Sequence, residues 1–451
     1  MRLTASTKDF SEGFSVKDDI FDRKKLHDQI MRVAINAVDK SLVLALDDKW
    51  GNGKTSFVKM MESEIKINHS EVAEVIYFDA FKSDYQSDPF VALTANIYAM
   101  TEKDINLKSL GDKLLEAGKR LGASFVISGS KFAISAVTAG LVSGTAVEKL
   151  GDAISESISS PLEKYIEEKI KSSKEEAITI ETFGKILTAI HQESGKKIIF
   201  IIDELDRARP DFSLDLLEKI KHIFSVEGVI FLLVVNREQF QKSIESRYGN
   251  INSKLYLNKF VHYWFTLPKD GVFTKGSQVG INQPTIVRYL RSIDEHNTFL
   301  GRSGVILKVL AGLLEANSCS LREAERCYSV LSIIAPSETQ LYVNDTYKTA
   351  TALIAFLKVH NSILLTEIIS KKHNADKVIE ALNILDTPFS GSTEYSLIRL
   401  ILDYHYATDN ELSAIRRERN NDFYEIEGGY PRRIDIMKIV YSSVEGFDVN
   451  F

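Results

Sequence analysis

The chain has few cysteines, no excess of positive charge and no apolar stretch at its N-terminus. Its two cysteines, Cys319 and Cys327, lie eight positions apart, which is neither a CxxC pair nor a disulfide framework. The net charge of −6 provides no general attraction to nucleic acid. Residues 1–10 lack the apolar core of a secretory signal. These absences predict a cytoplasmic protein whose thiols are apolar core residues.

Recognisable metal-binding and catalytic patterns are also missing. The nine histidines are scattered, with neither HExxH nor the Cys/His spacing of a zinc site. The region from Tyr347 onward contains helical patterns, no internal repeat and no nuclease or protease constellation. Charged residues make up 26% of the chain and hydrophobic residues 44%, which is typical of globular proteins. The length of 451 residues predicts about two to four domains.

A glycine-containing turn follows the first apolar run, residues 41–46. This turn and the start of the next predicted helix read K-W-G-N-G-K-T-S. Two glycines allow positive φ angles, so that backbone N–H groups can converge on a phosphate, and the helix N-terminus adds further N–H groups. We expect Lys54 to reach the β- and γ-phosphates and Thr55 to hold Mg²⁺. The predicted nucleotide-contacting residues are Trp50, Gly51, Asn52, Gly53, Lys54, Thr55 and Ser56.

The turn departs from the G-x-x-x-x-G-K-[ST] pattern at its first glycine. Asp48 stands there, with Asp47 beside it. Two carboxylates next to a polyphosphate are unfavourable unless they point away or meet a cation. A chance G-N-G-K-T string in a loop is the alternative, so a second motif is needed.

That second motif is an acidic turn after a strand. Residues 198–202 are five consecutive β-formers, as in a strand buried on both faces of a parallel sheet, and Asp203 and Glu204 follow directly. Acidic residues at the carboxyl end of such a strand lie where α/β sheets bind ligands. We expect Asp203 to hold Mg²⁺ and Glu204 to act as general base. A solvated acidic turn is the alternative for this segment taken alone.

A third unbroken apolar run, residues 229–235, ends at Asn236. The amide of Asn236 has two possible roles, and the sequence favours neither. It could orient the attacking water or contact the γ-phosphate, or it could cap the helix that begins near Arg237.

Several short segments, in order, resemble the KAP family of P-loop NTPases, within the wider AAA+ and STAND-like additional-strand group. They are residues 18–23, 50–56, 77–81, 84–85, 88–90, 203–210, 220–224 and 256–268. The departures are Asp48 for glycine and Phe81 where many relatives carry Trp. The resemblance implies ATP and Mg²⁺ as cofactors and nucleoside-triphosphate hydrolysis as the activity.

The resemblance also suggests a biological setting. It implies a nucleotide-driven component that assembles or remodels a partner complex, in bacterial or phage-related settings that include anti-phage defence. The alternative is a nucleotide-gated scaffold with little turnover, which recruits a separate effector. A homo-oligomer and a separate effector protein are therefore the expected partners. The basic and aromatic residues 416–433 leave nucleic acid possible, although a surface patch or interface is the favoured interpretation.

Together the strands and the resemblance predict an α/β fold with a parallel-sheet P-loop NTPase core. We expect this core at residues 15–268, with a helical insertion at 104–180. A helical lid follows at 269–345, and an α-helical C-terminal domain at 346–451.

Residues 121–147 carry one charge, Lys131, and lie where KAP proteins often carry membrane helices. The uninterrupted part, residues 132–147, has 16 residues, against roughly 20 needed to span a bilayer. We therefore favour a packed helical insertion over a membrane hairpin. Membrane association through this segment is not excluded. Apolar residues at helical spacing in 149–176 predict an amphipathic helix, interrupted near Pro161.

Arginines from a neighbouring subunit often complete such sites. Arg207 and Arg209 are our first candidates for this role, followed by Arg247. Each could instead pair with a nearby carboxylate: Asp206, Asp211 or Glu245.

A further arginine belongs to the predicted lid. Ser320 and Glu323 have the spacing of a capping box at the start of a helix. The resemblance suggests that Arg322, in the first turn of this helix, reaches over the phosphates as a second sensor. A solvated charge cluster is the alternative.

Overall fold

The computed structural model describes residues 9–37, 41–86, 88–128, 161–268, 284–294, 300, 304–334, 344–418, 426 and 433–446. The chain divides into two compact units. The helical unit consists of residues 1–29, 47–64 and 266–451, and the sheet unit of residues 30–46 and 65–265.

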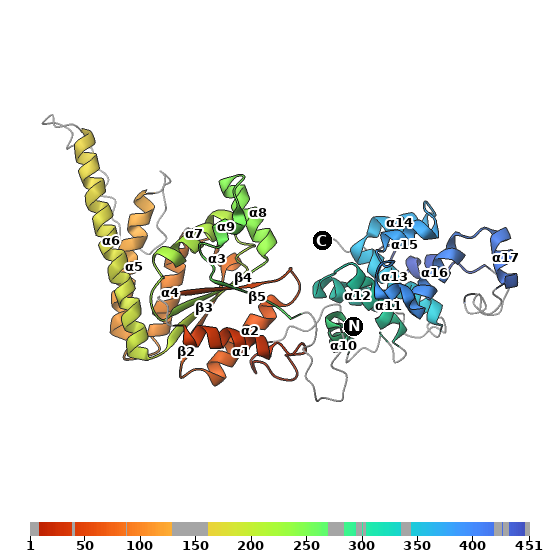
Figure 1. Cartoon of the computed structure of the whole chain (residues 1–451), viewed down its shortest axis with the longest axis horizontal. Coiled ribbons are helices and arrows are strands. Elements are labelled where there is room, and N and C mark those ends of the chain that lie inside the picture. Colours follow the sequence, from red (N-terminus) through yellow and green to blue (C-terminus); the bar gives the residue numbers. More distant parts are fainter. Residues whose placement is uncertain are drawn as a thin grey trace. The chain divides into compact units, whose positions relative to one another are not determined.

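Five strands form one sheet in the order β2-β3-β4-β1-β5 (Figure 1). They are β1 (Leu42–Asp47), β2 (Ala73–Asp79), β3 (Lys197–Asp203), β4 (Val229–Val235) and β5 (Tyr263–Thr266). Strands β2, β3 and β4 pair in parallel. Every residue of β4, and all of β3 after Lys197, is buried, as an unbroken apolar run predicts for a central parallel strand. The predicted α/β fold with a parallel sheet is confirmed.

The register places the polar residues that end neighbouring strands at one edge of the sheet. Asp79, the last residue of β2, lies opposite Asp203, the last residue of β3. Ile202 in turn lies opposite Leu233, three residues before Asn236. Because parallel strands end at the same edge, these side chains gather where ligands bind in this class of fold.

Phenylalanines fill the core against β3 and β4. The rings of Phe200 and Phe231, on neighbouring strands, stack with centroids 5.1 Å apart. Phe90 and Phe183 come from the helices that cover this face, with centroids 5.2 Å apart. Phe224 contacts all four rings, with centroids between 5.6 and 6.5 Å away. Aromatic pairs of this kind add to the free energy gained by burying apolar surface.

In the described residues, nine helices precede β5 along the chain. They are α1 (Lys24–Asn36), α2 (Lys54–Asn68), α3 (Ala80–Ser83), α4 (Pro89–Thr101), α5 (Lys108–Ser128), α6 (Pro161–Ser194), α7 (Pro210–His222), α8 (Arg237–Tyr248) and α9 (Ser253–Leu257). Helix α5 packs between α4 and α6 (Figure 1).

The predicted insertion is helical at both ends, since α5 and α6 lie largely within residues 104–180. Helix α6 begins at Pro161, where the sequence predicts an interruption and where a helix tolerates proline. Residues 129–160 lie outside the described residues, so most of the predicted 121–147 segment and the first part of the amphipathic stripe do too. Where the structure does describe the chain, no helix has both the length and the apolarity to cross a bilayer.

The helical unit contains a second hydrophobic core. Its later elements are α10 (Thr285–Asp294), α11 (Val305–Ala316), α12 (Leu321–Ile334), α13 (Asp345–His360), α14 (Ser362–Ile369), α15 (Ala375–Ala381), the 3₁₀ helix η3 (Pro388–Gly391), α16 (Thr393–Tyr406), α17 (Asp409–Glu418) and α19 (Ile436–Ser442). Helix α13 is buried over nearly its whole length, and α11, α12, α14, α16 and α19 pack around it. An apolar surface on all sides suits a helix in this central position.

Candidate nucleotide-binding site

The phosphate loop, residues 48–53, leads from β1 into α2. Gly51 and Gly53 have φ angles of +84° and +83°, the left-handed region that glycine adopts without strain. Helix α2 begins at Lys54, so its free N–H groups follow the loop directly. The loop therefore has the backbone geometry that the sequence predicts.

Lys54 is buried beneath this loop. Its side-chain Nζ donates to the carbonyl oxygen of Asp48 at 2.5 Å and to that of Lys49 at 3.2 Å. Thr55 is exposed in the first turn of α2, and Trp50 is 44% exposed. The Lys54 ammonium is thus fixed against the loop backbone. Thr55, whose hydroxyl is the predicted Mg²⁺ ligand, is the next residue of the chain.

The carboxylate of Asp48, at the position of the expected glycine, helps to shape the loop. Its Oδ1 accepts from the backbone N–H of Lys49 at 2.7 Å and from the side-chain amide of Asn52 at 2.6 Å. These bonds satisfy a buried carboxylate that would otherwise be costly. The departure from the glycine pattern is therefore compatible with a closed loop.

Arg23 is a site residue that the sequence analysis did not single out. It is 2% exposed, and its guanidinium donates to the carbonyl oxygens of Asn52 at 3.1 Å and Gly53 at 3.4 Å. Burial lowers the pKa of Arg23 to about 10, against the opposing effect of Asp48, so the group stays charged at neutral pH. A lone arginine ahead of the first strand is no motif, and only the segment resemblance at 18–23 pointed to it.

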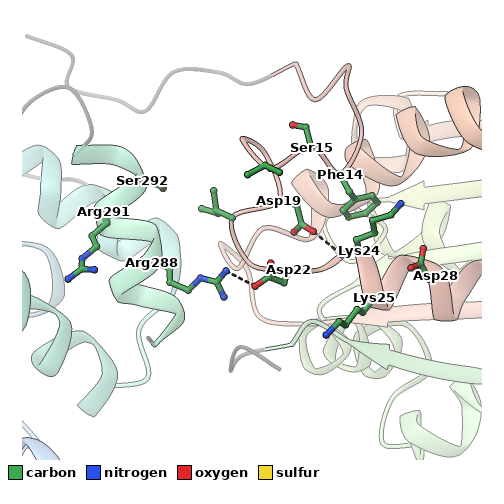
Figure 2. Close-up of a pocket in the computed structure, with 12 residues that line it drawn as sticks. Phe14, Ser15, Asp19, Asp22, Lys24, Lys25, Asp28, Arg288, Arg291 and Ser292 are labelled. Carbon is green, nitrogen blue, oxygen red and sulfur yellow. Dashed lines mark hydrogen bonds and ion pairs between the residues drawn. The ribbon is translucent and has the colours of Figure 1, made fainter. Parts of the chain in front are cut away.

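The orientation of Arg23 depends on the start of α1, which Figure 2 shows. The carboxylate of Asp19 accepts from the backbone N–H of Arg23 at 2.7 Å. It also accepts from that of Lys24 at 2.9 Å, the bond drawn in Figure 2. Asp22 pairs with Arg288 of α10 at 2.8 Å across a cavity of about 790 Å³. These bonds fix the turn before α1 and thereby the buried guanidinium.

A second cavity of the helical unit, of about 410 Å³, adjoins the phosphate loop. Arg23, Asp48 and Asn52 line it on one side, and residues of α10, α11 and the start of α12 on the other. Its volume lies within the range of small-molecule sites, about 300–1,000 Å³. This cavity is the candidate space for the rest of a nucleotide.

The lid arginine lies beside the loop, as the resemblance implies. A Cβ atom on Gly51 would lie 2.7 Å from Cβ of Arg322 and 3.0 Å from Oγ of Ser320. The capping box is formed, because Ser320 N–H donates to Glu323 at 2.7 Å and Glu323 N–H to Ser320 Oγ at 3.3 Å. Arg322 is exposed. The structure thus brings it to the loop, while its sensor role stays a prediction.

In the sheet unit, Asp203 ends β3 and is 1% exposed. The hydroxyl of Tyr77, on β2, donates to Asp203 Oδ2 at 2.9 Å. Burial and the Asp203 charge raise the pKa of Tyr77 far above its ordinary value, so this hydroxyl remains a donor. Tyr77 is a second residue without a sequence motif. A fixed, buried carboxylate fits Mg²⁺, which prefers oxygen ligands in a strict geometry.

Glu204 follows in an unusual backbone conformation. Its φ is +59°, in the left-handed region that non-glycine residues rarely occupy. Its N–H donates to Asp203 Oδ1 at 2.9 Å, and its carboxylate forms an ion pair with Arg207. The Arg207 guanidinium also lies over the ring of Phe81, 5.0 Å from its centroid. Strained residues of this kind often occur at functional sites.

The other arginines predicted to act in trans have partners within the chain. Arg209 donates from its backbone N–H to Asp84 Oδ2 at 3.0 Å and from its side chain to the Asp84 carbonyl. Arg247 pairs with Asp211 at 3.2 Å, one of the three carboxylates offered as alternative partners. Arg207 pairs with Glu204 rather than with the nearby carboxylates that the sequence suggested.

Asn236 caps α8. Its Oδ1 accepts from the backbone N–H of Gln239 at 3.3 Å. The capping role is therefore confirmed, whereas contact with water or phosphate stays a prediction. The predicted residues thus form two groups: 50–56 and Arg322 in the helical unit, and Asp203, Glu204, Arg207, Arg209 and Asn236 in the sheet unit.

Among solved structures, those of the ORC2 protein of Aeropyrum pernix are similar in part. The ADPNP–ADP complexes have 11% identity and a TM-score of 0.34, with 94% of this chain and 86% of that chain covered. The ADP form has 13% identity and a TM-score of 0.28, with 87% and 92% covered. These scores are too low to carry an argument.

None of the curated proteins matches the chain. The model of the KAP family P-loop domain, however, matches residues 23–336, well over half of the sequence. Both the phosphate loop and the acidic strand end lie within this range. The chain belongs to the KAP family of P-loop NTPases, and membership implies nucleotide binding.

Proposed function

We propose that this protein is an ATPase that binds ATP with Mg²⁺ and hydrolyses it. The observation that carries this proposal is Glu204, an acidic residue held at positive φ directly after the buried Asp203. A phosphate-binding loop alone suits any nucleotide-binding protein. Hydrolysis additionally requires a positioned base that accepts a proton from water, and the carboxylate of Glu204 at the end of β3 can serve as that base.

The residues have distinct tasks in this reaction. The loop N–H groups and Lys54 bind the phosphates, and the Thr55 hydroxyl and Asp203 would hold Mg²⁺. When bound, Mg²⁺ supplies positive charge to the phosphate oxygens. Tyr77 fixes the orientation of the Asp203 carboxylate. Glu204 accepts the proton of the attacking water, for which its carboxylate must be free.

A second candidate is a nucleotide-gated scaffold with little turnover, and one observation favours it. Arg207 pairs with the carboxylate of Glu204 and so occupies the group that would accept the proton of water. We infer that this pair opens when the protein is active. If it stayed closed, ATP would act as a bound structural element.

Steady-state phosphate release separates the two candidates. An ATPase loses about 10²- to 10⁴-fold in turnover in Glu204→Gln, with nucleotide affinity by calorimetry retained. Lys54→Ala should lose affinity as well. Equal background release by wild type and Glu204→Gln, with tight ATP binding, would establish the scaffold. No binding of adenine nucleotides by wild type would refute both.

We further propose that the nucleotide state drives assembly or remodelling of a homo-oligomer with a separate effector, in bacterial anti-phage defence. Support comes from the family resemblance alone. A cytoplasmic location agrees with two free cysteines, one of them buried. Native mass measurements with and without ATP and Mg²⁺ test the assembly. A mass that corresponds to one chain under both conditions would contradict it.

A further inference from the structure

Three side chains with metal-binding chemistry meet where α12 begins and α13 ends. Cys319 lies two residues before α12, Glu323 lies in its first turn, and His360 is the last residue of α13. Their ligand atoms all lie within 4.8 Å of one another. They are called the thiol cluster below. The sequence analysis found no metal pattern because Cys319 and His360 are 41 residues apart.

Two of the three separations in this cluster, those to His360 Nδ1, fit one small ion. Cys319 Sγ lies 3.5 Å from His360 Nδ1, and that nitrogen lies 3.5 Å from Glu323 Oε1. Zinc bonds are about 2.3 Å to sulfur and about 2.1 Å to nitrogen or oxygen. At a tetrahedral angle they separate S and N by about 3.6 Å, and N and O by about 3.4 Å. The observed distances are close to both values.

We propose that the thiol cluster binds a transition-metal ion of the Zn²⁺ type through Cys319 Sγ, Glu323 Oε1 and His360 Nδ1. Thiolate, imidazole and carboxylate together suit Zn²⁺ or Co²⁺ far better than Mg²⁺ or Ca²⁺. Three protein ligands leave a fourth position for water or another donor. None of these three ligands takes part in the proposed ATPase reaction.

The ligands are held by contacts outside the cluster. The second carboxylate oxygen of Glu323 accepts from the N–H of Ser320 at 2.7 Å and from its hydroxyl at 2.9 Å. The His360 ring stacks on Phe356, with centroids 4.9 Å apart. Helices α12 and α13 pack together, and the C-terminal end of α13 favours a cation. Such outer contacts orient metal ligands and reduce the entropy lost on binding.

Metal binding releases a proton from the thiol cluster. Partial burial and the neighbouring Glu323 raise the pKa of the Cys319 thiol to about 12, although Lys49 acts in the opposite direction. The thiol therefore enters the reaction protonated: the S–H bond breaks, a bond from sulfur to metal forms, and the proton leaves to solvent. In the metal-free protein the hydrogen bond from His360 lowers the pKa of Glu323 to about 2, so the carboxylate is already ionised. His360 binds the metal as the neutral tautomer that carries its proton on Nε2, which leaves the lone pair of Nδ1 for the ion.

The position of the cluster connects it to the phosphate loop. Cys319 lines the cavity of about 410 Å³ together with Arg23 and Asp48. Its neighbour Ser320 lies against Gly51. A metal in the cluster would thus fix the start of α12, which carries Arg322.

Cobalt substitution of the full-length protein tests the site. Co²⁺ bound by a thiolate gives a near-ultraviolet charge-transfer band and intense visible bands when tetrahedral. We expect these bands to saturate at one equivalent in wild type and to disappear with added Zn²⁺. Cys319→Ser should lose the charge-transfer band, and Glu323→Gln and His360→Gln should weaken binding by about tenfold or more. Cys327→Ser, which removes the buried thiol of α12, should leave the spectrum unchanged.

A measurement on wild type alone guards against variants that misfold. Alkylation of Cys319, followed by mass spectrometry, should slow at least tenfold when Zn²⁺ is added, while alkylation of Cys327 does not change. No thiolate band in wild type would overturn the proposal. So would an unchanged band in Cys319→Ser, or equal alkylation of Cys319 with and without Zn²⁺.

Discussion

The phosphate loop and the acidic end of β3 are held in place in different ways. At the loop, Lys54 and Arg23 donate to backbone carbonyls, and two glycines with positive φ set the shape. At the strand end, side chains hold side chains: Tyr77 donates to Asp203 and Arg207 pairs with Glu204. The loop should therefore be sensitive to small steric changes. The strand end should respond in a graded way to the loss of single polar atoms.

The largest effect is expected from one methyl group in the loop. Gly51→Ala places a Cβ atom 2.7 Å from Cβ of Arg322, at a φ of +84°. The left-handed conformation and the overlap together cost about 2–4 kcal/mol, so the free loop relaxes away from the phosphate-binding conformation. Nucleotide binding must then restore that conformation, which lowers affinity by up to about 30- to 700-fold. Calorimetric titration with ATP and Mg²⁺ measures it.

Gly249→Ala is the matched control, because Gly249 has a φ of +76° with nothing within 4 Å of the added atom. Its ψ of −154° lies in a region that glycine almost alone adopts, so the variant should cost about 1–3 kcal/mol of stability and leave ATP affinity unchanged. Equal ATP affinity in the two variants would mean that the loop adapts, and the contrast with the strand end would be lost.

Arg23→Lys tests the second support of the loop. A lysine keeps the charge but loses the fork that reaches the carbonyls of Asn52 and Gly53, so we expect about a tenfold loss of nucleotide affinity. Arg288→Lys is the control, because Arg288 pairs with Asp22 and has no hydrogen bond to the loop among those described. An equal loss in both would assign the effect to the turn before α1 instead.

At the strand end, Tyr77→Phe removes one hydroxyl and little volume. Asp203 then loses the donor that fixes its carboxylate, and we expect the Mg²⁺ concentration for half-maximal turnover to rise about tenfold. Tyr98→Phe removes a comparable bond, 3.4 Å long, to Asp112 and should have no effect. An unchanged Mg²⁺ requirement in Tyr77→Phe would show that Asp203 needs no orientation.

Local features of the site could be predicted from the sequence, because each depends on neighbouring residues. The strand before Gly51, the buried run before Asp203 and the capping box at Ser320 all follow from composition and spacing. Contacts between distant segments could not be predicted. No local pattern indicates that the carbonyls of residues 52 and 53 accept from Arg23. None indicates that Tyr77 on β2 donates to Asp203 on the neighbouring strand β3.

Asp48 is a second residue whose contacts could not be predicted from the sequence. In the sequence, Asp48 counted against a phosphate loop because it deviates from the glycine pattern. Its bonds to Lys49 and Asn52 could not be predicted, because they depend on the loop conformation itself. The ion pair of Glu204 is similar. The spacing of Glu204 and Arg207 suits an ion pair within one turn. The sequence analysis instead predicted that Arg207 pairs with other carboxylates or acts in a neighbouring subunit.

The smallest expected effect concerns that pair and has the opposite sign. Arg207→Ala frees the Glu204 carboxylate, and because Arg207 is 40% exposed the pair is worth at most about 1 kcal/mol. Basal turnover should therefore rise by up to about fivefold, with ATP affinity unchanged. Arg120→Ala, which removes an exposed arginine paired with Glu116 on α5, should leave turnover the same. If Arg207 instead acts in a neighbouring subunit, its loss lowers turnover by about 10³-fold, and the fall depends on protein concentration. The sign of the change thus decides whether Arg207 restrains the base of its own chain or completes the site of another.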